Sequence, residues 1–211
     1  MILVRSLTRV HQWAALAVIL GLTVLREPLL FQFPRIWAEE GKFYLAQAYG
    51  KTLAEALAFV EFGYYNLSAT AAGYFAGNFF PLEQAPGVTL SVALFVQMTA
   101  FYIILSSRAA FWDSPIKKLV GAALVLFIPN APEVWLNSIN SQYWLTLIAF
   151  LILLEDIPSL TRNRRWAFRV LLFFAGLSTP MACYLTPVFL WDAWTSRLNW
   201  KPAGRERSAQ T

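Results

Sequence analysis

Two adjacent glutamates, Glu39 and Glu40, are the residues whose type and spacing are best suited to chemistry. They lie in the charged stretch Pro34 to Leu45, with the sequence PRIWAEEGKFYL, which closely follows an apolar N-terminal segment. An ionised carboxylate only accepts hydrogen bonds, so the pair could receive a sugar hydroxyl or a divalent cation. One carboxylate could then act as a general base or metal ligand while the other orients its partner.

Adjacent residues of a helix point about 100° apart, which limits how the two carboxylates can cooperate. They can act as a matched pair only if the backbone turns near them, and Gly41 permits such a turn. Without the turn, both charges are solvated and carry no chemistry, and the spacing alone leaves both alternatives open. A divalent cation, Mg²⁺ or Mn²⁺, held by Glu39 and Glu40 is the one cofactor that the sequence suggests.

Further polar side chains could complete a binding site around the acidic pair. Arg35 and Lys42 flank it, and guanidinium and ammonium groups bind phosphate. Tyr44 follows in the same stretch, while Asn140 and Gln142 belong to a polar segment far along the chain. These five residues are the candidate substrate contacts. The alternative is that the cations contact lipid headgroups and that the amides cap helices.

The composition indicates a membrane protein. Hydrophobic residues make up 58% of the chain and charged residues only 14%, whereas soluble domains contain about 25% charged residues. The run Gly87 to Ser107 carries no charge, and about 20 apolar residues in a helix cross a bilayer. The net charge of +5 is therefore expected to report orientation and contact with membrane lipids, and we expect no nucleic acid partner.

Apolar runs divide the chain into about six membrane segments. A break at Ser178 to Pro180 splits the last run into a short hairpin, because proline does not continue a helix. Two prolines within 129–132 end the apolar run 119–128 in the same way. The sequence thus predicts an all-α, polytopic membrane protein. The expected segments are 13–25, 87–107, 119–128, 143–154 and the two halves of 170–191.

The distribution of lysine and arginine sets the expected orientation. With the hairpin, 13 of the 17 basic residues lie on one side, and basic loops face the cytoplasm. We therefore expect a multi-pass protein of the inner cell membrane with both termini in the cytoplasm and the acidic pair on the outer face. Residues 1–211 would form one membrane domain, with an outer loop at 26–86, further segments at 87–195 and a basic cytoplasmic tail at 196–211.

The long outer loop is expected to be helical and amphipathic. Leu45, Tyr49 and Leu53 recur at a spacing of four residues, opposite polar side chains. This pattern predicts one helix over residues 41–58 that lies along the outer membrane surface. A second helical piece is expected from Ser68 to Phe80, which is rich in alanine, glycine and aromatic residues.

The order of these features resembles the integral-membrane glycosyltransferases of the GT-C fold. These proteins have a short cytoplasmic N-terminus, a first span and a long outer loop that opens with an acidic pair. The chain resembles their N-terminal half, and the resemblance covers nearly all of it. The stretches that carry it are Trp37–Leu45, Pro81–Pro86, Asn140–Leu145 and Gly176–Pro180. Two departures stand out: the family usually pairs Glu with Asp, whereas both acids here are Glu, and its members are longer.

The resemblance implies a function. The chain would transfer a hexosyl or pentosyl group from a polyprenyl-phosphate carrier to a cell-envelope acceptor. Glu40 would be the general base for the acceptor hydroxyl, and Glu39 its neighbour or a cation ligand. Arg35 and Lys42 would hold the donor phosphate. The alternative is a non-catalytic membrane protein, either a degenerate copy or an accessory subunit of a membrane protein partner.

Overall fold

The computed structural model describes residues 7–60, 63–128 and 134–198, and every regular element in these ranges is a helix. The prediction of an all-α fold is therefore confirmed. The predicted proline break at 129–132 lies outside the described residues, as does the basic tail from residue 199 onward.

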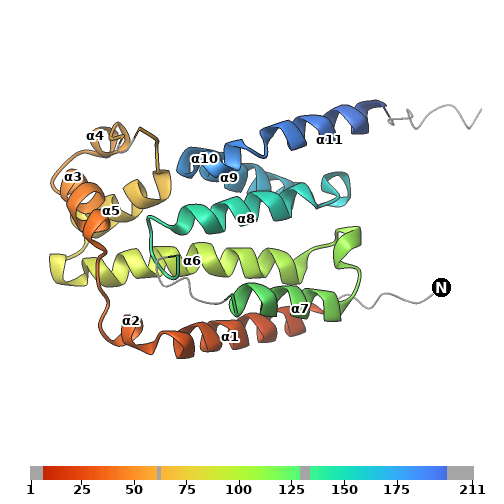
Figure 1. Cartoon of the computed structure of the whole chain (residues 1–211), viewed down its shortest axis with the longest axis horizontal. Coiled ribbons are helices and arrows are strands. Elements are labelled where there is room, and N and C mark those ends of the chain that lie inside the picture. The colour runs from red at the N-terminus through yellow and green to blue at the C-terminus, as the bar shows by residue number, and fades with distance from the viewer. Residues whose placement is uncertain (1–6, 61–62, 129–133, 199–211) are drawn as a thin grey trace, which may run out of the picture.

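Six helices run lengthwise along the molecule and alternate in direction (Figure 1). They are α1 (Arg9–Arg26), α6 (Ala85–Ser106), α7 (Pro115–Leu126), α8 (Ser141–Leu153), α9 (Arg162–Ser178) and α11 (Thr186–Leu198). The start of α1 and the end of α11 consequently lie at the same end of the bundle (Figure 1). Short elements join them: α2 (Pro28–Gln32), η2 (Leu82–Gln84), η3 (Ala110–Trp112), η4 (Ile157–Ser159) and α10 (Pro180–Cys183).

Helix α6 forms the centre of the apolar core. Its side chains Phe101 and Ile104 are buried, and they belong to the same apolar cluster as Leu145 and Ile148 of α8. At the end of α1, the Arg26 guanidinium donates hydrogen bonds to the carbonyl oxygens of the α7 C-terminal region and stacks over the Trp135 ring, 4.2 Å from its centroid. These contacts tie α1 and α7 together at one end of the bundle.

Among the described residues, Leu82–Ser106 is the one helix that is long and apolar enough to cross a membrane by itself. It coincides with the span expected at 87–107. The pair Arg162–Ser178 and Pro180–Thr195 meets the same requirement only jointly, with a bend of 118° between its halves. The break expected at Ser178 to Pro180 is therefore present in the fold.

The single helix predicted for residues 41–58 is wrong. The segment instead forms the π-helix η1 (Glu40–Leu45), α3 (Ala46–Ala48) and α4 (Leu53–Leu57). Gly50 adopts a φ of +67°, a left-handed conformation that interrupts the helix. Thr52 and Glu55 then form a reciprocal capping box that starts α4 as a new element.

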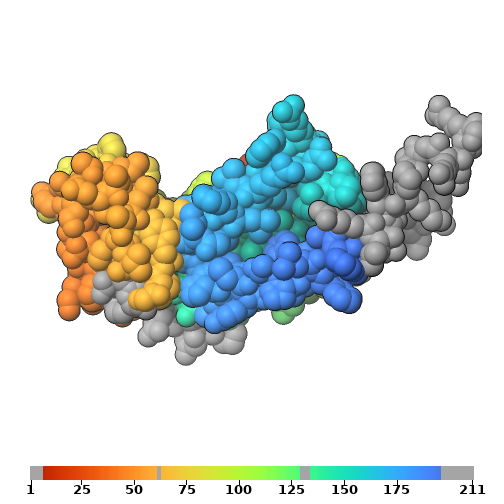
Figure 2. Space-filling view, turned by 90° about the horizontal axis from the view of Figure 1, so that it is seen from above, coloured from red at the N-terminus to blue at the C-terminus, as the bar shows by residue number. Residues whose placement is uncertain are grey.

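Helix α5 (Leu67–Phe79) confirms the helical piece expected at residues 68–80, and it packs against η1. Its small residues Ala69, Gly73 and Gly77 are buried at a spacing of four residues, which lets another backbone approach closely. A Cβ atom on Gly73 would lie only 2.8 Å from the backbone C and O atoms of Tyr44. The position of η1 therefore requires a glycine at residue 73, because any side chain there would meet the Tyr44 backbone. Figure 2 shows these segments, in orange and yellow, gathered at one end of the molecule beside α9 and α11.

Candidate active site

Glu40 begins η1, and its side chain is almost completely buried, with only 2% of its surface exposed. Its Oε2 atom accepts a hydrogen bond of 3.2 Å from the Trp37 backbone N–H. Its Oε1 atom accepts one of 3.0 Å from the Ser138 N–H and a short one from the Ser138 hydroxyl. The carboxylate therefore joins the acidic stretch to a turn that lies 98 residues further along the chain.

A buried polar network continues from Ser138 to two further helices. The Asn66 amide donates to the Ile139 carbonyl oxygen at 3.1 Å and accepts from the Ser68 hydroxyl at 2.7 Å. The Ser68 N–H donates in turn to the Ser178 hydroxyl at 3.1 Å. The start of α5, the end of α9, the turn before α8 and η1 thus meet at one polar junction, which fixes where Glu40 lies.

Burial raises the pKa of Glu40 above its ordinary value of 4.5. The cost of removing the charge from water outweighs the hydrogen bonds from Ser138 and Trp37, which act in the opposite direction. A carboxylate with a raised pKa holds its proton more readily than an exposed one. Such a perturbed group is common at functional sites, although structural networks also produce it.

The raised pKa predicts how Glu40 affects stability. When the folded pKa exceeds the unfolded value, the folded state binds more protons and stability falls as pH rises through that window. The free energy of unfolding of the wild type, relative to Glu40→Gln, should therefore decrease as pH rises above 4.5. Denaturant unfolding in detergent, from about pH 4 to about pH 8, measures this difference. A difference that grows with pH would contradict the burial of an ionisable carboxylate.

The fold does not bring the two glutamates of the pair into one site. Glu39 is exposed whereas Glu40 is buried, so their carboxylates have different surroundings. The Glu40 carboxylate accepts three hydrogen bonds from protein donors, and these donors would compete with a cation for the same oxygens. The described residues also contain no group of three His, Cys, Asp or Glu side chains that could hold a metal. A Mg²⁺ or Mn²⁺ ion shared by Glu39 and Glu40 does not fit this geometry.

The expected substrate contacts within the acidic stretch are divided between the surface and the core. Arg35 and Lys42 are exposed, and each cation lies about 5 Å from the ring centroid of a neighbouring aromatic side chain, 5.1 Å for Arg35 and 5.0 Å for Lys42. Tyr44 is only 3% exposed and packs edge-on against Phe59 at 6.1 Å. Tyr44, which was predicted as a substrate contact, therefore lies in the core, because η1 directs its side chain against Ala69 of α5.

The polar residues before α8 shape the Ser138 turn. The side-chain oxygen of Asn137 accepts hydrogen bonds from the N–H groups of Ile139 and Asn140, at 2.9 and 3.2 Å. Leu136 has a φ of +54°, which makes the turn tight. Asn140 lies two residues after Ser138 and is half-buried, whereas Gln142 is buried in the first turn of α8. Asn140 is therefore the one of this pair that stays close to the surface of the junction.

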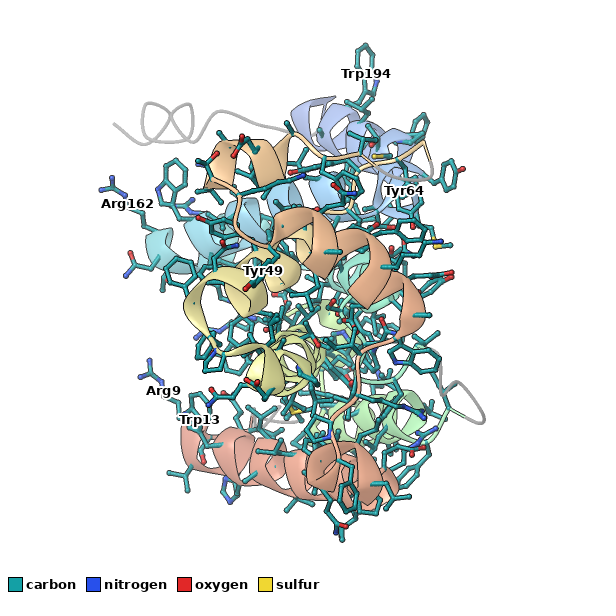
Figure 3. The ribbon with its side chains drawn as sticks, turned by 90° about the vertical axis from the view of Figure 1, so that its left-hand side faces the viewer. Arg9, Trp13, Tyr49, Tyr64, Arg162 and Trp194 are labelled. Atoms are coloured by element: carbon teal, nitrogen blue, oxygen red, sulfur yellow. The ribbon has the colours of Figure 1, made fainter. Side chains whose placement is uncertain are left out.

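Sequence reasoning missed Ser138, Asn66 and Ser178 as partners of the acidic stretch. Ser138 lies in the turn before α8, Asn66 caps the start of α5 with its side chain, and Ser178 ends α9. Figure 3 views this end of the molecule, where Tyr49 and Tyr64 are labelled.

No protein family model matches the chain, and neither a curated protein nor a solved structure matches it.

Proposed function

We propose that this chain is a polytopic membrane glycosyltransferase of the GT-C type. It transfers a hexosyl or pentosyl group from a polyprenyl-phosphate carrier to an acceptor in the cell envelope. The proposal rests on the sequence resemblance and on the way the fold holds the acidic stretch at the end of the bundle.

Exposed apolar side chains support placement in a membrane. Five different helices present a large apolar residue that is more than 60% exposed, namely Val18, Phe95, Leu124, Phe173 and Leu190. Trp194 of α11 also projects away from the bundle (Figure 3). Exposed apolar side chains on so many helices are consistent with contact to lipid or to another protein. We propose that lipid covers these side chains and that the η1 end lies outside the cytoplasm. Reporter fusions after Ser178 that are active only in the cytoplasm would overturn this orientation.

We propose roles for the two glutamates that differ from those implied by the family resemblance. A general base must come within hydrogen-bond reach of the acceptor hydroxyl. Glu40 is buried and already accepts three hydrogen bonds, so it acts as the positioning residue. Glu39 is exposed directly beside it, so it is the carboxylate that an acceptor can reach. The single observation that carries the proposal is the hydrogen-bonded, buried position of Glu40. It fixes the backbone beside Glu39, and a catalytic side chain must be held in a fixed position.

The proposed reaction follows from these positions. The acceptor oxygen forms a bond to the anomeric carbon while the bond from that carbon to the phosphate oxygen breaks. The acceptor proton passes to the Glu39 carboxylate, and polyprenyl phosphate leaves with the bonding electrons. Arg35 and Lys42 are exposed in the same stretch and would bind the leaving phosphate through charge-assisted hydrogen bonds.

Donor consumption in proteoliposomes tests the proposal. Full-length protein would be reconstituted and supplied with polyprenyl-phosphate hexoses and pentoses, together with an envelope extract as acceptor. We expect release of free polyprenyl phosphate from one donor that requires the acceptor extract. Absence of release from every donor, from protein that is folded and correctly inserted, would overturn the transferase proposal.

The second candidate function is that of an accessory membrane protein. It is favoured by the same hydrogen bonds around Glu40, because a buried carboxylate that accepts three donors can also serve only to hold the fold together. In that case Glu39 is a solvated surface charge. The substitutions of Glu39 described in the Discussion separate the two functions.

A further inference from the structure

A cavity lies between the end of α6 and the start of α7. These two helix ends meet at the end of the bundle opposite α3 (Figure 1). The volume of the cavity is about 350 Å³. Polar or charged side chains in its lining are those of Ser107, Arg108, Asp113, Ser114 and Lys118, beside Ala109, Ala110 and Trp112. Nothing in the reaction proposed above uses this cavity.

Lys118 is the most unusual residue of the cavity, because only 3% of its surface is exposed. Its ammonium group donates a hydrogen bond of 2.6 Å to the carbonyl oxygen of Ser107, just after the last turn of α6. An ammonium group has three donors, so this contact leaves two for a ligand or another partner. A lysine this deeply buried is rare unless an opposite charge accompanies it.

The charges around the cavity do not balance. Glu155 is fully buried and forms an ion pair of 3.5 Å with Arg164, which also donates to the carbonyl and hydroxyl oxygens of Ser106. The Arg108 N–H donates to the other Glu155 oxygen at 3.4 Å. The Glu155 carboxylate thus accompanies two cations in this region, Lys118 and Arg164, and the exposed Arg108 side chain adds a third positive charge at the cavity.

The remaining carboxylate of the cavity does not supply the missing charge. Asp113 forms an exposed ion pair with Lys117 at 2.8 Å, which offsets its charge locally. The hydroxyl oxygens of Ser107 and Ser114 each accept a backbone N–H, so each hydroxyl proton can donate to an anion. The cavity therefore offers positive charge and hydroxyl donors, which is the chemistry that binds phosphate.

We propose that this cavity binds the phosphate group of an anionic phospholipid. Two apolar side chains near it in sequence, Phe111 and Ile116, are more than 60% exposed, which suits contact with acyl chains. Basic pockets between membrane helices bind anionic headgroups in the same way. A lipid therefore fits better than a free phosphate ion, which needs no apolar surroundings.

Native mass spectrometry of the full-length protein in detergent tests this site. We expect one phosphatidylglycerol molecule to remain bound, and phosphatidylcholine to be retained at least about tenfold more weakly. Arg108→Gln removes a cavity cation without emptying the core and should weaken retention about tenfold, and Lys118→Met should weaken it further. Arg162→Gln is the matched control, because Arg162 is exposed and points away from the bundle (Figure 3).

Several results would overturn the proposal. Equal retention of the two phospholipids would show that no charge recognition occurs. Equal losses in Arg108→Gln and Arg162→Gln would show only general attraction to the basic end of the molecule. Displacement of phosphatidylglycerol by inorganic phosphate at comparable concentration would assign the cavity to free phosphate instead of a lipid. Because Arg108 is exposed, its variant remains informative even if Lys118→Met fails to fold.

Discussion

Glu39→Gln is expected to reduce sugar transfer by about 10²–10⁴-fold while the protein remains folded in the membrane. Glutamine keeps the size and reach of the side chain but loses the charge that accepts the acceptor proton. Glu39 is exposed, so the substitution leaves the buried network around Glu40 intact. Release of polyprenyl phosphate from proteoliposomes measures the loss, and the free energy of unfolding should stay within about 0.5 kcal/mol of the wild type.

Glu83→Gln is the matched control for this variant. Glu83 is an exposed glutamate of η2, within the same 26–86 segment as Glu39, and no proposed step uses it. It should transfer sugar at the wild-type rate. Full activity of Glu39→Gln together with inactive Glu40→Gln would show that Glu40 is the reacting carboxylate, as the family resemblance implies. The assignment of roles by exposure would then be wrong.

Gly73→Leu is expected to lower both stability and activity through the same displacement. The new side chain would meet the backbone of Tyr44, since even a Cβ atom there lies 2.8 Å from its C and O atoms. Overfilling a packed contact costs about 1–3 kcal/mol of unfolding free energy. Because η1 would move away from α5, Glu39 would shift as well, and a displacement of about 1 Å costs about 10²-fold in rate.

Gly87→Leu provides the comparison for Gly73→Leu. Gly87 lies in the first turns of α6, and a Cβ atom there would meet nothing within 4 Å. Leucine should therefore be tolerated, with wild-type transfer and a free energy of unfolding that is unchanged or higher. Denaturant unfolding and the proteoliposome assay measure both variants. If Gly73→Leu behaved like Gly87→Leu, the close contact between α5 and η1 would not determine the position of the acidic stretch.

Local sequence patterns predicted helix α6 and the break after α9. The charge-free run at 87–107 gave α6 with ends that differ by one or two residues, because apolar length alone determines such a helix. Pro180 predicted the break between α9 and α10 for a similar reason, since proline lacks the N–H that a helix interior needs. The break of the 41–58 segment was also readable, because Thr52 and Glu55 have the spacing of a capping box.

The candidate site could not be predicted in the same way. Glu40 meets Ser138 across 98 residues of sequence, and no periodicity in either segment encodes that contact. The difference between buried Glu40 and exposed Glu39 follows from how η1 packs on α5, which depends on Gly73. Sequence spacing drew attention to the acidic pair, but only the tertiary contacts distinguish its two members.

The double variant Glu39→Gln/Glu40→Gln, expressed in cells that lack the native gene, tests the central claim most directly. The measurement is the sugar composition of the envelope by mass spectrometry, at protein levels matched to the wild type in the membrane. Wild type and Glu83→Gln should restore a sugar that the deletion strain lacks, and the double variant should leave it missing. Full restoration of that sugar by the double variant would contradict the proposed roles of both Glu39 and Glu40 and favour the accessory function.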